Sequence, residues 1–179
     1  MRPTFEKDSE QTLKFHGALV ELAKLNHSTL DAALEGITQI AARTLGIARA
    51  SVWIFNENRT GIDCNVLFQI GRGHERKKVH LRASDFPRYF AALERNRVIA
   101  ASDAHHHPDT SEFSESYLAP LGINSMLDVP IWRHGKTIGV LCHEHVGPVH
   151  EWTHEEKDFA ASVADTISLS YEAIDQAAR

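Results

Sequence analysis

The sequence predicts an α+β domain in which one antiparallel sheet is covered by helices from both ends of the chain. Two observations support this fold class. Apolar residues recur at helical spacing near both termini, and between them lie short apolar runs separated by clusters of turn residues. Strands joined by short turns pair antiparallel. Helices at the ends with hairpins in the middle are therefore typical of an α+β fold.

Two helices are expected at the start of the chain. Asp8 or Ser9 can cap the first helix, and Asn26-His27 ends it. Ser28 can cap the second helix, and Gly46 ends it. The apolar stripes are Phe15, Leu19, Leu22 and Leu25 in the first helix, and Leu30, Leu34, Ile37, Ala41 and Leu45 in the second.

A β-hairpin follows these helices. Residues 50–55 (ASVWIF) and 62–70 are short apolar runs that predict two strands, and the turn residues at 56–61 (NENRTG) join them. A third, short strand is expected at 79–81.

The middle of the chain predicts short elements. A helix of two or three turns is expected from Ser84, followed by a short strand at 98–100. Residues 102–110 (SDAHHHPDT) form a loop, and a short helix over 111–121 is ended by Gly122.

A second hairpin and a last helix complete the prediction. Residues 125–132 predict a strand whose side chains alternate between two faces, and 137–145 predict its partner strand across a tight turn at 134–136. Thr153 caps the last helix, and Glu156 completes a capping box. We expect this helix to run to the last residue, with an apolar stripe of Phe159, Val163, Ile167, Tyr171 and Ile174.

Length and composition indicate a single domain over residues 1–179, with a core at about 15–172. Domains commonly contain roughly 100–200 residues, and a chain that is 42% hydrophobic can bury a core. The formal net charge is -5, and no long run of Lys or Arg occurs. A nucleic-acid partner is therefore not expected.

No apolar run is long enough for a transmembrane helix, and the polar residues 1–11 contain no signal-peptide core. Two cysteines do not form a disulfide framework, and free thiols suit a reducing compartment. These features predict a cytoplasmic protein without a membrane partner.

Three stretches resemble a GAF domain. The first is the predicted hairpin that begins at residues 50–55. The second is 117–131 (YLAPLGINSMLDVPI), which is similar to the family's short helix, Gly and strand ending in L-x-V-P-I. The third is 134–145 (HGKTIGVLCHEH), which is similar to the family's G-x-x-x-G-V-L strand. With the closing helix after Trp152, the likeness covers about residues 15–172.

This resemblance implies a roughly six-stranded antiparallel sheet with the terminal helices on one face. Loops and short helices from about 71 to 124 would close a ligand pocket on the other face. It also implies a bacterial sensor that forms a homodimer through its terminal helices. Such domains often regulate a histidine kinase or a cyclic-di-GMP output domain. No output module is recognisable in the sequence, so we expect either an excised or a standalone sensor domain.

The layout of the family suggests which residues line the pocket. The ligand-binding residues expected are Trp53, Phe68, Asp85, Phe86, Tyr89, Asp103, Tyr117, Leu118, Ser125, Leu127, Cys142 and Glu144. Trp53, Phe68 and Leu127 can equally belong to the core. The carboxylates of Asp85, Asp103 and Glu144 need a partner on an enclosed face, either a ligand or an arginine. The arginines considered are Arg88, Arg97 and Arg133.

The resemblance does not identify the ligand or a cofactor. Residues 84–87 and Cys142-His143 resemble phytochrome-type GAF domains, but Phe113 occupies the position of the bilin-binding cysteine, four residues before Tyr117. The N-K-x-x-x-F-D-E signature of domains that bind cyclic GMP has no counterpart. A reductase of free methionine sulfoxide needs mobile, exposed cysteines, whereas Cys64 and Cys142 lie in predicted strands.

Twelve histidines raise two further alternatives, a metal site and a pH sensor. His105-His106-His107 lies on a loop with Asp103 and Asp109, and no compact metal motif such as H-E-x-x-H occurs. We therefore expect a polar loop at the rim of the pocket, and no metal.

These arguments predict a sensory domain that binds a small molecule and transmits the signal through its terminal helices. No clustered nucleophile and base points to an enzyme. The alternative is a dimerisation module whose pocket is filled, and a closed core among Trp53, Tyr89, Tyr117 and Leu127 would favour it.

Overall fold

One antiparallel sheet forms the centre of the computed structural model, which describes residues 4–25, 28–76 and 78–179. The strand order is β3-β2-β1-β7-β6-β5, and β4 pairs with β2. The strands are β1 (Arg49–Phe55), β2 (Gly61–Gln69), β3 (Gly73–Glu75), β4 (His80–Arg82), β5 (Ile99–Ala101), β6 (Ile123–Arg133) and β7 (Lys136–Val146). The predicted fold class is therefore confirmed.

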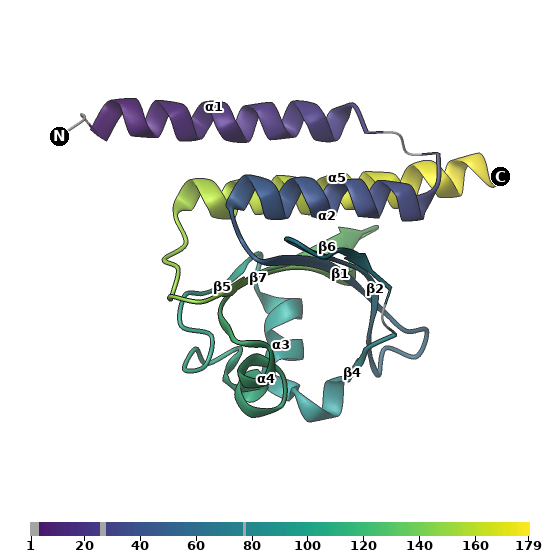
Figure 1. Ribbon diagram of the computed structural model, residues 1–179. Helices are drawn as coiled ribbons and strands as arrows, with labels where there is room; N and C mark the ends of the chain where they lie inside the picture. Colours follow the sequence, from purple (N-terminus) through teal and green to yellow (C-terminus); the bar gives the residue numbers. More distant parts are fainter. Residues whose placement is uncertain (1–3, 26–27, 77) are drawn as a thin grey trace.

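Three long helices lie on one side of this sheet (Figure 1). The helix α2 (Leu30–Leu45) and the last helix α5 (His154–Ala177) run side by side over the sheet. The first helix, α1 (Thr4–Ala23), lies outside them and forms a further layer.

Short helices cover the opposite face of the sheet (Figure 1). The 3-10 helix η1 (Ala83–Asp85) leads into α3 (Pro87–Arg95). A second group consists of η2 (Ser111–Phe113), the π-helical turn η3 (Ser114–Leu118) and α4 (Ala119–Leu121). The segment predicted as one helix over 111–121 is therefore divided into three short turns, and Gly122 ends it with φ 68°.

The sheet separates two apolar cores. The helix-side core joins α1, α2 and α5 to the sheet, and it contains a stacked pair of rings, Phe15 and Phe159. The opposite core lies beneath α3 and η2, and its aromatic centre is Phe86, Tyr89 and Phe113. Both faces of the central strands are therefore buried.

Local signals place most helix ends. Thr153 and Glu156 form the predicted capping box, and Gly46 ends α2 with φ 66°. The cap of α2 is Thr29 rather than Ser28, because the Thr29 hydroxyl accepts the amide of Ala32 at 3.2 Å.

Other predicted boundaries need correction. Helix α1 already begins at Thr4, and α5 ends at Ala177 rather than at the last residue. The strand β3 was not predicted at all. The predicted break at Asn26-His27 lies outside the described residues.

A β-bulge interrupts β2 and changes which residues face each side. Trp53 pairs with Cys64, but the preceding residue Val52 pairs with Val66, so Asn65 is the extra residue. An extra residue reverses the alternation of side chains beyond it. Consequently Cys64 and Phe68 face opposite sides of the sheet.

No helix among the described residues is both long enough and apolar enough to cross a membrane.

Candidate functional site

A cavity of about 510 Å³ opens on the face of the sheet that carries the short helices. Its floor comes from β1 and β2, and its walls come from β3, the segment before β4, and the turns η3 and α4. The lining residues are Arg49, Trp53, Cys64, Leu67, Gln69, Arg72, Glu75, Val79, Ser116, Tyr117, Pro120 and Leu121. This volume suits a small organic molecule.

Strand register builds the floor of this cavity. Arg49 lies between Gln69 on β2 and Glu144 on β7, because both are its cross-strand partners. Trp53, further along the same face of β1, pairs with Cys64. The indole N–H of Trp53 donates to the Ser51 hydroxyl at 2.8 Å, which fixes the ring against the sheet.

Arg49 and Glu144 form a buried and incompletely bonded pair at this floor. Arg49 Nε lies 4.0 Å from Glu144 Oε2, and their side chains are 10% and 1% exposed. Both of these atoms are buried without a hydrogen-bond partner. Tyr117 donates to the other oxygen, Glu144 Oε1, at 3.1 Å. Burial raises the pKa of the Glu144 carboxyl, although the nearby Arg49 and the Tyr117 hydroxyl lower it in part.

A second buried polar cluster lies deeper on the same face, away from the cavity. The Tyr89 hydroxyl donates to Asp128 Oδ2 at 2.5 Å, and Cys142 Sγ donates to the same oxygen at 3.4 Å. Burial raises the pKa of Asp128 to about 7 and raises the pKa of Tyr89 well above its usual value. Closely packed rings enclose this cluster, so it is part of the core rather than an open site.

Both cysteines are free, and neither is in an environment that activates a thiol. Burial raises the pKa of Cys64 to about 12, and it raises the pKa of Cys142 well above the usual range. A thiol nucleophile reacts as the thiolate, so these two positions do not resemble a reactive cysteine pair.

The cavity brings together only part of the predicted set. Trp53 and Tyr117 line it, whereas Glu144 is buried beside the lining residue Arg49 and is not itself in the lining. Four other members lie on the same side of the sheet but in the closed apolar core: Phe86, Tyr89, Leu118 and Cys142.

Five predicted residues lie elsewhere. Phe68 and Leu127 belong to the helix-side core, which corrects the expectation that they face the pocket. The bulge in β2 reverses the side of Phe68, and Leu127 alternates with the pocket-side Met126 and Asp128. Ser125 is buried, where its hydroxyl donates to the carbonyl of Ser102 and accepts the amide of His150.

Asp85 and Asp103 are exposed rather than enclosed. Asp85 pairs with Arg82 at 2.9 Å, and Asp103 pairs with His106 at 2.9 Å. The arginines considered as partners for the predicted carboxylates pair differently, Arg88 with Glu112 and Arg133 with Asp175.

The histidine-rich loop is held together by its own polar contacts. The ring nitrogen Nδ1 of His105 lies 2.7 Å from the Ser114 hydroxyl, and Nδ1 of His107 accepts the amide of Asp109 at 3.2 Å. Within residues 4–25, 28–76 and 78–179, no group of three or more His, Cys, Asp or Glu side chains is arranged to hold a metal ion.

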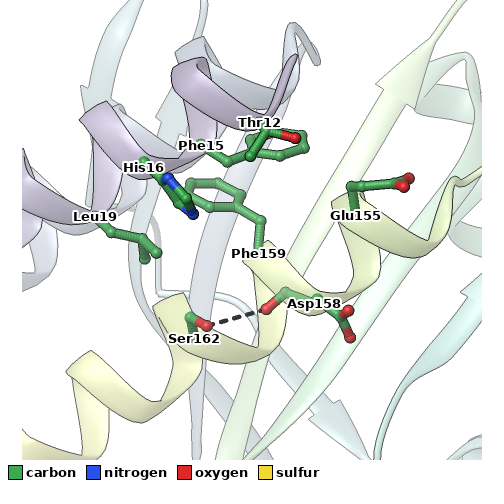
Figure 2. A pocket seen from close by; sticks show the side chains of 8 residues that line it. All are labelled: Thr12, Phe15, His16, Leu19, Glu155, Asp158, Phe159 and Ser162. Atoms are coloured by element: carbon green, nitrogen blue, oxygen red, sulfur yellow. Dashed lines mark hydrogen bonds between the residues drawn. The ribbon is translucent and has the colours of Figure 1, made fainter. Parts of the chain in front are cut away.

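A shallow groove of about 200 Å³ lies between α1 and α5, on the other side of the sheet. Figure 2 shows Phe15 and His16 of α1 opposite Phe159 and Ser162 of α5. The stacked rings of Phe15 and Phe159 are part of the lining of this groove.

Sequence reasoning missed the charged residues that distinguish the cavity. Arg49 precedes an apolar run and was not considered, and Arg72 lies in the turn between β2 and β3. A usable signal was present in β7, where Glu144 follows the apolar run 140–142. A charged residue within an apolar strand needs a buried partner.

Comparisons with known proteins agree with this architecture. A GAF domain family model matches residues 29–171. A search of curated proteins returned no match. Two similar solved structures are a bacteriophytochrome chromophore-binding domain from R. palustris (15% identity, TM-score 0.75, covering 96% of this chain and 63% of that chain) and the GAF domain of a phosphoenolpyruvate-protein phosphotransferase from Coxiella burnetii (18% identity, TM-score 0.70, covering 94% and 97%).

A third similar structure is a far-red absorbing protein in its dark state with bound biliverdin (17% identity, TM-score 0.72, covering 90% of this chain and 99% of that chain). The chain spans less than two thirds of the R. palustris chain, at 63%, and 38% of a phytochrome photosensory core module from Stigmatella aurantiaca. At these identities the likeness shows the fold. Because the family model matches most of the chain and the fold agrees with these structures, the chain belongs to the GAF domain family.

Proposed function

We propose that this GAF domain is a sensor that binds a small organic molecule in the 510 Å³ cavity above β1 and β2. The observation that supports this best is the lining of the cavity. It combines apolar side chains, among them Trp53 and Leu67 on the floor, with polar groups that include Arg49 and Tyr117. Ligand sites commonly have this composition, whereas a filled core leaves no such volume.

The layers of the fold connect the cavity to the terminal helices and so offer a route for a ligand-induced signal. The strands β1 and β2 form the cavity floor on one face and pack against α2 on the other. A ligand that favours one arrangement of these strands would also favour one arrangement of the terminal helices. We propose that α1 and α5 pass this change to a dimer partner, or to a kinase or cyclic-di-GMP output domain in a longer signalling protein.

Exposed apolar side chains on the terminal helices support a homodimer. Leu13 and Val20 on α1 are 67% and 53% exposed, and Leu169 on α5 is 63% exposed. Light scattering at increasing protein concentration tests this proposal. A Leu13→Glu/Leu169→Glu variant should remain monomeric, whereas wild-type protein should dimerise.

We propose a cytoplasmic location, because both cysteines are free and free thiols suit a reducing compartment. The chemistry of the site suits a regulatory role better than an enzymatic one. The raised pKa values of both thiols do not favour sulfoxide reduction. The filled dimerisation module remains the second candidate, because the cluster around Tyr89 is closed.

Native mass spectrometry of the purified domain, repeated after denaturation, tests ligand binding. A Cys64→Phe variant should fill the cavity, and Val149→Phe is its control, because Val149 is 52% exposed and outside the lining. The sensor proposal would be supported by a bound mass that is lost on denaturation, is present in wild-type protein and in Val149→Phe, and is absent from Cys64→Phe. A domain that stays empty after incubation with nucleotides, tetrapyrroles and organic acids would support the dimerisation module.

A further inference from the structure

The side chain of Arg49 is unusual for its burial, because its Nε is buried without a hydrogen-bond partner among the described residues. An arginine carries five N–H donors and is normally buried only when these are paired. The Arg49 side chain is 10% exposed, and its only ionic contact among the described residues is Glu144 at 4.0 Å. Its Nε is buried with no hydrogen bond.

Glu144 does not compensate this charge fully. The 4.0 Å separation is too long for a hydrogen bond, and Oε2 of Glu144 is also without a partner. The hydroxyl of Tyr117 already occupies the other carboxylate oxygen. Burial raises the pKa of the Glu144 carboxyl, although Arg49 and the Tyr117 hydroxyl lower it in part. The positive charge of Arg49 is therefore desolvated and only partly balanced.

This charge faces the cavity rather than the core, since Arg49 is one of the lining residues. The apolar ring of Trp53 and the side chains of Leu67 and Pro120 lie in the same lining. Two other lining residues carry charges of opposite sign, the exposed Arg72 and the half-buried Glu75. Because these two are nearer to water, their charges are better screened than that of Arg49.

We propose that the cavity selects an organic acid, whose anionic group accepts hydrogen bonds from Arg49 while its apolar body packs against Trp53. This inference rests on the proposed ligand-binding function and adds the chemical class of the ligand. A planar guanidinium can bind a carboxylate or sulfonate with two parallel hydrogen bonds. An acceptor from the ligand would satisfy the donors that the protein leaves open, at a site where water is partly excluded.

Two fluorescent probes of nearly the same shape test this proposal. Anilinonaphthalene sulfonate is an aromatic acid, and phenylnaphthylamine is the same ring system without the acid group. Energy transfer from Trp53 to either probe reports binding in the cavity, and the signal should fall in a Trp53→Phe variant. We expect wild-type protein to bind the sulfonate at least about 10-fold more tightly than the amine, as a charge-assisted hydrogen bond implies.

The Arg49→Met variant should lose this preference and bind both probes with similar affinity. Since this change leaves Glu144 buried beside an apolar side chain, the double variant Arg49→Met/Glu144→Gln provides a second test with no charge left at the floor. Arg97→Met is the matched control, because Arg97 is an arginine outside the lining, and it should keep the preference.

The results separate the two proposals. If wild-type protein binds both probes equally and Cys64→Phe abolishes both, the cavity binds ligands but the inference about organic acids is wrong. If neither probe binds, or if Cys64→Phe binds them unchanged, the ligand-binding function and the inference both fail. A preference that persists in both Arg49 variants would also overturn the role of Arg49.

Discussion

Replacing Asp128 with asparagine should change how the stability of this domain depends on pH. Asp128 is fully buried, and burial raises the pKa of its carboxyl from 3.8 to about 7. Between these pH values the folded domain holds a proton that the unfolded chain releases. The free energy of unfolding therefore falls as pH rises through this window. A difference of about 3 pKa units corresponds to about 4 kcal/mol.

The imidazole of His143 on β7 has the opposite effect on the pH dependence of stability. Burial lowers the pKa of its imidazole from 6.5 to about 4, although the hydrogen bond between Nδ1 and the Leu127 carbonyl raises it in part. The unfolded chain binds a proton between these values and the folded domain does not. Stability therefore rises with pH there, by about 3 kcal/mol. In the wild-type domain these two contributions largely offset each other.

The substitution removes one of the two opposing contributions. Urea unfolding followed by tryptophan fluorescence, repeated between about pH 4 and about pH 7, measures the effect. The free energy of unfolding of wild-type protein, minus that of Asp128→Asn, should fall by about 4 kcal/mol across this range. Groups common to both proteins cancel in this difference.

The control for this experiment is Asp85→Asn, since the Asp85 side chain is 44% exposed. Its difference from wild-type protein should show a much smaller trend with pH. A difference between wild-type protein and Asp128→Asn that stays constant with pH would refute the argument that burial holds a proton on Asp128.

Three further predictions concern local packing and thiol chemistry. Gly139→Ala should lower the free energy of unfolding by about 3 kcal/mol in urea titrations, because a Cβ at this position would lie 2.1 Å from the Trp53 carbonyl oxygen. An unchanged urea midpoint would contradict this close approach. Thr153→Ala should cost about 1 kcal/mol in the same assay through loss of the capping box of α5, whereas Ser162→Ala within that helix should cost less. Cys64 should react with iodoacetamide roughly a thousandfold more slowly in the folded domain than in urea, because its pKa is about 12. Mass spectrometry of quenched samples measures both rates, and equal rates would show that the thiol is not desolvated.

Local sequence signals determined most elements of this fold. The turn residues at 56–61 and 134–136 predicted both long hairpins, β1–β2 and β6–β7, because turn chemistry acts over a few residues. The capping box at Thr153 and the left-handed Gly46 likewise act within one turn of helix. The family resemblance added a roughly six-stranded antiparallel sheet with the terminal helices on one face, and the structure confirms the fold.

Only the tertiary structure shows which face of the sheet each side chain lies on and which polar side chains are in contact. The extra residue Asn65 in β2 moves Phe68 to the helix-covered face, and a simple alternation of side chains does not predict it. Arg49 and Glu144 become neighbours because β1 pairs with β7, although they are far apart in the sequence. Contacts of this kind depend on strand register and on the packing of distant segments. The sequence therefore determines the helices, hairpins and family, whereas the location and charge of the cavity follow from long-range pairing that local propensities do not encode.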